Sequence, residues 1–199
     1  MLKIIHRVNT IEKLREIPLK YGVEVDVRSN RGKLILHHDP FQEGESLEDF
    51  LKEFKHKFII LEIKEEGIEK RVIELCKKYG ITNYFLLSVS FPFMYNLSKE
   101  GIRKMAVRFS EFESIETALT MAKKVDWVWV DTFTKNPLKR DVFLRLKKAG
   151  FRICIVCPER WGRSEDIDRY ITYFKKNEIF PDAVMTVSSE IQHWEKLDA

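Results

Sequence analysis

The chain has 199 residues, of which 44% are hydrophobic and 33% charged, and a formal net charge of +4. These values suit one soluble domain over residues 1–199 with a sizeable core, and the weak, scattered positive charge argues against nucleic acid as a partner. No segment approaches the roughly 20 apolar residues of a transmembrane helix, and the apolar run at the N-terminus is too short for a signal peptide, so we expect a cytoplasmic protein.

The three cysteines are an odd number and lie in apolar segments, which is typical of reduced, buried thiols. Cys154 and Cys157 have the spacing of a redox motif, but they fall within an apolar pattern typical of a strand. Residues three apart in a strand face opposite sides, so we do not expect them to form a redox or metal site.

Short apolar runs alternate with amphipathic segments along the whole chain. Each run is about five to seven residues long and rich in Val, Ile, Phe or Trp, as strands are. The predicted strands are Leu2–His6, Val23–Arg28, Phe58–Ile63, Tyr84–Val89, Lys104–Phe109, Trp127–Asp131, Phe151–Val156 and Asp182–Thr186. An additional extended run, Lys33–His38, follows a turn and is predicted to form a hairpin with the second strand.

The segments between the strands have helical spacing of apolar residues. Ile68, Val72 and Cys76 form one regular stripe, and residues 142–149 suggest a less regular one. Alternating strands and helices imply parallel pairing, which leaves a doubly wound open sheet or a (β/α)₈ barrel. Eight strands with polar residues at their C-terminal ends favour the α/β class and a compact (β/α)₈ TIM barrel without an inserted cap domain.

Ionisable residues gather at the ends of the first predicted strands. Glu24 and Asp26 are two apart, as are Glu62 and Lys64, so each pair faces one side of its strand. Burying this much charge is costly without a metal ion or an anionic ligand. Three carboxylates (Glu24, Asp26, Glu62) without a Cys/His set favour Mg²⁺ or Ca²⁺ over zinc.

Two histidines, His6 and His38, close predicted strands that end at the same rim. A neutral imidazole can accept a proton from a nucleophile while a protonated one donates to the leaving group. His37 is the weaker candidate because it faces away by strand parity. Arg7 and Lys64 are the natural phosphate contacts, Arg through two oxygens at once and Lys as a point charge.

The ordered set of His-Arg, Glu-x-Asp, His-Asp and Glu-x-Lys, with Ser90-Phe91 after the fourth strand, resembles the glycerophosphodiester phosphodiesterase family over essentially the full chain. The resemblance implies a TIM barrel and a metal-dependent phosphoric diester hydrolase acting on a small phosphodiester. It also implies these roles: His6 and His38 as acid and base, Glu24, Asp26 and Glu62 as metal ligands, Arg7 and Lys64 as phosphate contacts.

The chain departs from the family pattern in two places. Val8 stands where the family has glycine after His-Arg, and only residues 40–57 separate the His-Asp and Glu-x-Lys pairs, which leaves almost no cap. Arg108 at the fifth strand end is a further candidate for substrate binding. Trp161 is another, either as a stacking surface for a headgroup beside Arg160 or as a cover over the barrel. The oligomeric state is not predicted.

Two alternatives remain open at this point. The same residues would serve a lyase or transferase that stops at a cyclic phosphate. The first loop is also shorter than the family's, and this difference and the missing cap are compatible with a barrel that binds a phosphorylated ligand without turnover.

Overall fold

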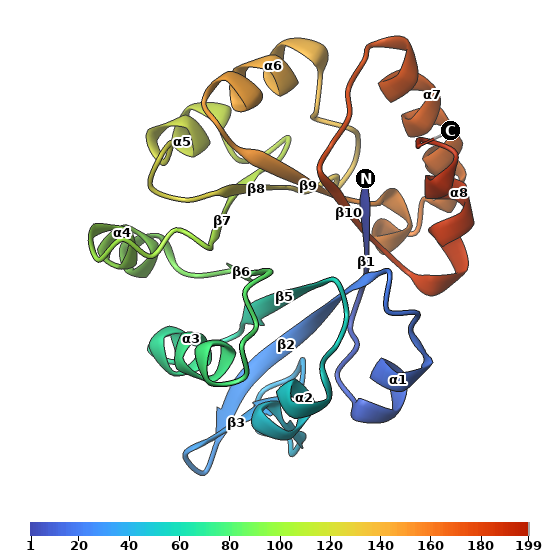
Figure 1. Cartoon of the computed structure of the whole chain (residues 1–199). Helices are drawn as coiled ribbons and strands as arrows, with labels where there is room; N and C mark the ends of the chain where they lie inside the picture. The colour runs from blue at the N-terminus through green and yellow to red at the C-terminus, as the bar shows by residue number, and fades with distance from the viewer. Residues whose placement is uncertain (199) are drawn as a thin grey trace.

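Eight parallel strands form a ring with helices on its outside (Figure 1) in a computed structural model that describes residues 1–198. Ala199, the last residue of the expected domain, lies outside the described residues. The ring strands are β1 (Leu2–Ile5), β2 (Gly22–Asn30), β5 (Phe58–Ile63), β6 (Tyr84–Leu87), β7 (Ala106–Phe109), β8 (Trp127–Val130), β9 (Arg152–Val156) and β10 (Ala183–Thr186). All eight predicted runs therefore form strands, with no end shifted by more than two residues.

Ladder pairing runs from β6 through β5, β2, β1, β10, β9 and β8 to β7. Between β6 and β7 the ring is joined by one isolated bridge, Leu86 to Met105, and the backbone N–H of Leu86 donates to the Lys104 carbonyl at 2.9 Å. The N–H of Met105 instead donates locally to the Arg103 carbonyl at 2.7 Å. The sequence pattern predicted a strand from Lys104, but β7 begins at Ala106 because of this local turn. The fold is a (β/α)₈ barrel with one weak seam.

The helices lie around the outside of the ring, and one follows each ring strand, with a short hairpin excursion over residues 33–46 between β2 and its helix (Figure 1). They are α1 (Ile11–Glu16), α2 (Leu47–Glu53), α3 (Glu69–Lys78), α4 (Phe91–Lys99), α5 (Ile115–Thr120), α6 (Arg140–Lys148), α7 (Ile167–Lys176) and α8 (Ile191–Glu195). Short 3₁₀ turns cover Pro158–Trp161, Ser164–Asp166 and Ser188–Glu190. None of these helices has both the length and the apolar character that a membrane span requires.

Strand parity divides the core into two parts. Inward-facing residues such as Phe85, Trp127 and Cys154 fill the barrel, and outward-facing ones such as Val107 pack under the helices. Cys157 belongs to the outer cluster, so the two neighbouring cysteines do face opposite sides, and all three cysteines are free and buried. The barrel interior is therefore packed, and the charged side chains that face it among residues 1–198 lie toward the C-terminal ends of the strands.

The expected hairpin forms from β2 and β3 (Lys33–Leu36), with a two-residue strand β4 (Glu45–Ser46) beside β3. β3 ends at Leu36, so the predicted extension to His38 was wrong. One further cross-strand bond, from the N–H of His37 to the Asp26 carbonyl at 3.0 Å, follows Leu36, but the N–H of Asp26 donates to Asn9 Oδ1 and does not complete the pair. The loop returns close to β3 at Gly44, where a β-carbon would collide with the Leu36 carbonyl.

Candidate active site

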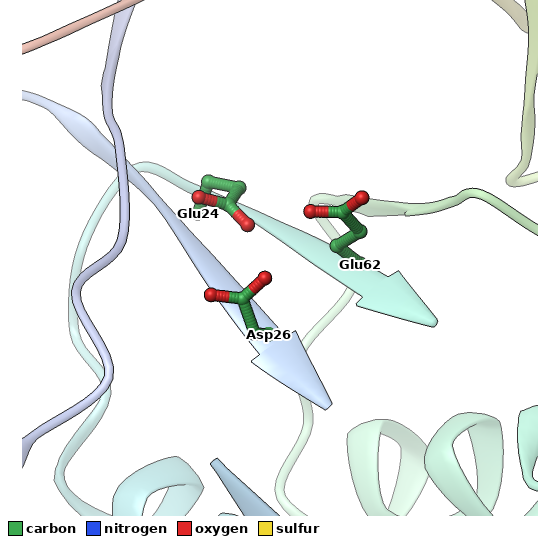
Figure 2. A group of neighbouring side chains, drawn as sticks. All are labelled: Glu24, Asp26 and Glu62. Carbon is green, nitrogen blue, oxygen red and sulfur yellow. The ribbon is translucent and has the colours of Figure 1, made fainter. Parts of the chain in front are cut away.

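Three carboxylates meet at the C-terminal ends of β2 and β5. Asp26 is the parallel partner of Glu62, and Glu24 lies two residues earlier on the same face of β2. One oxygen from each of the three carboxylates lies within 4.8 Å of the others. Figure 2 shows the three side chains pointing toward one another from the two neighbouring strands. The spacing in the sequence thus produces a single acidic cluster.

This cluster fits a hard divalent cation. Glu24 and Asp26 are buried, and Glu24 Oε1 has no hydrogen-bond partner among residues 1–198. Burial, and then the negative charges of Asp26 and Glu62, raise the pKa of Glu24 to about 8. Mutually repelling carboxylates with an unpartnered oxygen are stabilised by a cation that accepts oxygen ligands.

Asp26 is held in place by Asn9, a residue that the sequence pattern did not reveal. Asn9 Nδ2 donates to Asp26 Oδ2 at 2.8 Å, and the backbone N–H of Asp26 donates to Asn9 Oδ1 at 2.9 Å. Burial alone would raise the pKa of Asp26, but the bond from Asn9 and the charge of Lys64 together lower it. Asp26 therefore stays ionised beside Glu24.

Lys64 lies between the acidic residues of the two strands. Its Nζ is 3.2 Å from Asp26 Oδ1 and 3.3 Å from Glu62 Oε2. The other oxygen of Glu62 accepts a hydrogen bond from Ser88 Oγ at 2.9 Å. Ser88 follows β6 with a left-handed backbone, at φ 59°, which is uncommon for a residue other than glycine. Lys64 thus supplies positive charge between the carboxylates of β2 and β5.

His6 and Arg7 approach the cluster from the end of β1. Arg7 has φ 53°, and this left-handed turn directs its backbone N–H to Glu24 Oε2 at 2.8 Å. His6 Nε2 lies 3.8 Å from the same oxygen. Burial, followed by the positive charges of Arg160 and Arg7, lowers the pKa of His6 to about 3, so the imidazole is neutral near pH 7. A neutral imidazole is able to accept a proton.

His38 lies on the loop after β3 and not at a strand end. Its Nδ1 is 2.7 Å from Asp39 Oδ1, and this contact lowers the pKa of Asp39. Arg28 fixes the backbone here, donating to the His38 carbonyl at 3.0 and 2.9 Å and to the Lys64 carbonyl at 3.2 Å. One guanidinium therefore ties the two loops that carry His38 and Lys64.

A small cavity of about 60 Å³ opens beside the cluster. Its wall includes His6, Glu62, Arg108, Arg160 and Trp161. Such a volume holds roughly two water molecules, so it accommodates a phosphate-sized group and little more. Of the two arginines in the wall, Arg108 contacts Asp131, which also lines the cavity, and Arg160 adds a second positive charge.

Arg108 reaches inward from β7, as its place in the strand predicted. It contacts Asp131 with one guanidinium nitrogen and Glu113 Oε1 with another, the latter at 3.1 Å. Burial raises the pKa of Asp131 to about 6, although Arg108 opposes this shift.

Trp161 lines the cavity and is 38% exposed, with its ring 4.7 Å from that of Phe133. Arg160 also lines the cavity, but Arg163 is bonded to Asp166, Tyr170 and the Thr132 carbonyl. Trp161 and Arg160 are therefore available to a ligand, whereas Arg163 serves the loop.

Removing the buried charge of Glu24 tests the electrostatics of the cluster. Because the pKa of Glu24 is about 8 in the folded chain and near 4.5 when unfolded, the unfolded chain releases this proton first as the pH rises. In metal-free buffer, this carboxyl therefore destabilises the fold increasingly between about pH 4.5 and pH 8. Glu24→Gln should gain unfolding free energy over the wild type across that window, measured by urea denaturation with EDTA present. A difference between the two proteins that does not change with pH would contradict the predicted shift.

Comparison with known proteins bears on the fold. No family model matches the sequence. No curated protein sequence matches it either. A glycerophosphodiester phosphodiesterase from Thermotoga maritima superimposes with a TM-score of 0.73 at 21% identity, covering 99% of this chain and 98% of that one.

Two further solved structures have the same fold as this chain. A glycerophosphodiester phosphodiesterase from Agrobacterium tumefaciens has a TM-score of 0.64 at 14% identity, covering 94% of this chain and 96% of its own. A glycerophosphoryl diester phosphodiesterase from Parabacteroides distasonis has a TM-score of 0.67 at 12% identity, covering 99% and 86%. The chain has the glycerophosphodiester phosphodiesterase fold. The resemblance read from the ordered motifs is confirmed at the level of this fold, over nearly the whole chain.

Proposed function

We propose that the protein is a divalent-metal-dependent phosphodiesterase that hydrolyses a small glycerophosphodiester-like substrate. The observation that carries the proposal is the cluster of Glu24, Asp26 and Glu62, with metal-ligating oxygens within 4.8 Å of one another. It occupies the C-terminal end of the barrel strands, where TIM-barrel enzymes hold their active sites. His6 and Lys64 lie directly against it.

Glu24, Asp26 and Glu62 would hold the cation, and Mg²⁺ or Ca²⁺ suits their oxygen ligands best. When bound, the cation polarises the phosphodiester and lowers the pKa of an attacking hydroxyl. Lys64 and Arg7 would pair with the non-bridging phosphate oxygens, as their charge and their place beside Asp26 allow.

The two histidines would divide the proton transfers. His6, neutral because of its burial and the nearby arginines, takes the proton from the attacking water or substrate hydroxyl. A bond forms from that oxygen to phosphorus while the bond from phosphorus to the departing alcohol breaks. His38, whose proton the Asp39 carboxylate would balance, gives a proton to the departing oxygen.

Three further assignments accompany the function. We propose that residues 1–199 form one domain and that the partner is a small phosphodiester. The three unpaired cysteines support a reducing, cytoplasmic compartment.

A substrate panel tests the proposal. Purified protein incubated with glycerophosphodiesters of choline, ethanolamine, glycerol and inositol should release the alcohol with Mg²⁺ or Ca²⁺ and stop when EDTA is added. Phosphorus NMR of the products then separates the chemical alternatives: an accumulating cyclic phosphate supports a lyase, and a monoester supports hydrolysis. Calorimetric binding of a phosphodiester without turnover of any substrate would instead support a binding protein.

A further inference from the structure

An apolar groove of about 410 Å³ opens next to the phosphate-sized cavity, on the outer side of the barrel wall. Its size falls within the range of about 300–1,000 Å³ that ligand pockets occupy. The residues that line it are Val89, Phe91, Met94, Val107, Arg108, Phe112, Glu113, Ser114 and Thr117. Most of them come from the ends of β6 and β7 and the starts of α4 and α5.

The groove lies where the barrel wall is weakest. β6 and β7 are joined only at the bridge between Leu86 and Met105, and beyond it no pairing joins the two strands in the described part of the chain. Val89 follows β6 and Val107 lies on the outer face of β7, so the groove follows the side of this seam toward the C-terminal ends of the strands. The groove therefore opens sideways from the rim of the barrel, between the starts of α4 and α5.

Two features connect the groove to the cavity. Arg108 lines both spaces, and its guanidinium therefore stands at the inner end of the groove. A row of aromatic rings runs beside it: Phe112 of the groove lies 6.0 Å from Phe133, and Phe133 lies 4.7 Å from Trp161 of the cavity. Phe112 is 74% exposed, so this row has apolar surface free for contact.

We infer that the groove binds a hydrocarbon chain carried by the substrate, so that the enzyme prefers single-chain amphiphilic phosphodiesters. This inference rests on the proposed function. The cavity has room for the phosphate alone, so the alcohol attached to it must extend outward, and the groove is the apolar space in contact with it. Arg108 lies where phosphate and chain join, and the exposed ring of Phe112 covers the chain.

The test uses a series of phosphodiesters in which glycerol 3-phosphate is esterified with ethanol, butanol, hexanol or octanol. Each is used at a concentration below micelle formation. A groove that covers the hydrocarbon chain on one side should supply about half the free energy of fully burying each methylene group. The value of kcat/KM should then rise about twofold for each methylene added. The octyl diester should then exceed the ethyl diester by about 60-fold. Octyl phosphate should also bind in a calorimeter more tightly than ethyl phosphate.

Thr117 offers a variant that blocks the groove without disturbing the core. It is exposed on α5, so Thr117→Trp should fold, fill the groove and give octyl and ethyl diesters the same kcat/KM. Thr120→Trp is the matched control, being exposed on the same helix and outside the groove, and should keep the chain-length dependence.

A flat series in the wild type, with turnover of the short diesters, overturns the hydrocarbon site and leaves the phosphodiesterase intact. A rising series that Thr117→Trp does not flatten also overturns it, because the chain then binds elsewhere. Tight binding of octyl phosphate that Thr117→Trp removes, without turnover of any diester, supports the groove while the proposed activity fails.

Discussion

Glu62→Gln is expected to lower kcat/KM for a glycerophosphodiester by about 10²–10³-fold, the loss typical when one group stabilising transition-state charge is removed. Glutamine keeps the shape of the side chain and an oxygen for the bond from Ser88, but it removes one anionic ligand from the cluster. The barrel should stay folded because Glu62 is only partly buried and Lys64 keeps its contact with Asp26. Steady-state kinetics with Mg²⁺ or Ca²⁺ measure this loss.

Binding of the cation gives a second readout for the same variant. A cation at 100 times its dissociation constant should stabilise the wild type by about 2.7 kcal/mol, and Glu62→Gln should gain much less. Glu66→Gln is the control, since Glu66 is exposed in the loop just beyond β5 and has the same side chain. Equal loss of activity in the two variants, or an unchanged response of Glu62→Gln to the cation, would argue against the ligand role.

His38→Ala is expected to slow the release of an alkyl alcohol by about 10²–10⁴-fold, the usual contribution of a general acid. With a 4-nitrophenyl ester the loss should be small, because nitrophenolate departs without a proton. His6→Ala should be slow with both substrates, since the attacking oxygen still needs a base. This difference between the two histidines follows from the neutral state of His6 and the contact of His38 with Asp39.

The neighbouring histidine provides the control. His37 is adjacent to His38 on the same loop, and its Nδ1 accepts from the backbone N–H of Asp39 at 3.0 Å. His37→Asn keeps an acceptor for this bond and should retain activity within about threefold of the wild type. Full activity of His38→Ala on alkyl diesters would remove His38 from the mechanism.

The fold and the acidic cluster could be predicted from the sequence because both depend on strand periodicity. In a parallel barrel both faces of a strand are covered, so apolar runs mark the strands. The two-residue period then puts Glu24 and Asp26 on one face, opposite Glu62. Such local patterns need no knowledge of distant contacts.

Other parts of the site depend on contacts that are distant in sequence. Asn9 contacts Asp26 across 17 residues and Ser88 contacts Glu62 across 26, and no spacing rule connects these positions. The position of His38 was predicted as a strand end, but it is set by Arg28 and by the close return of the loop at Gly44. The contacts of Asn9 and Ser88 exist only once separate barrel strands have paired, whereas those of Arg28 and Gly44 belong to the hairpin after β2.

The seam between β6 and β7 was also beyond prediction from the sequence. The segment from Lys104 reads as one continuous strand, yet the N–H of Met105 donates locally to the Arg103 carbonyl, and only an isolated bridge to β6 remains there within residues 1–198. Strand propensity depends on side-chain type, so it does not reveal a backbone hydrogen bond that competes with strand pairing. The apolar groove beside the seam could therefore not be predicted from the sequence.

Anomalous diffraction from a crystal soaked in Mn²⁺ tests the metal site most directly. The account predicts one strong peak bounded by oxygens of Glu24, Asp26 and Glu62, with the Lys64 ammonium displaced from the acidic residues toward the cavity. A peak elsewhere, or none with Lys64 still between Asp26 and Glu62, would contradict it.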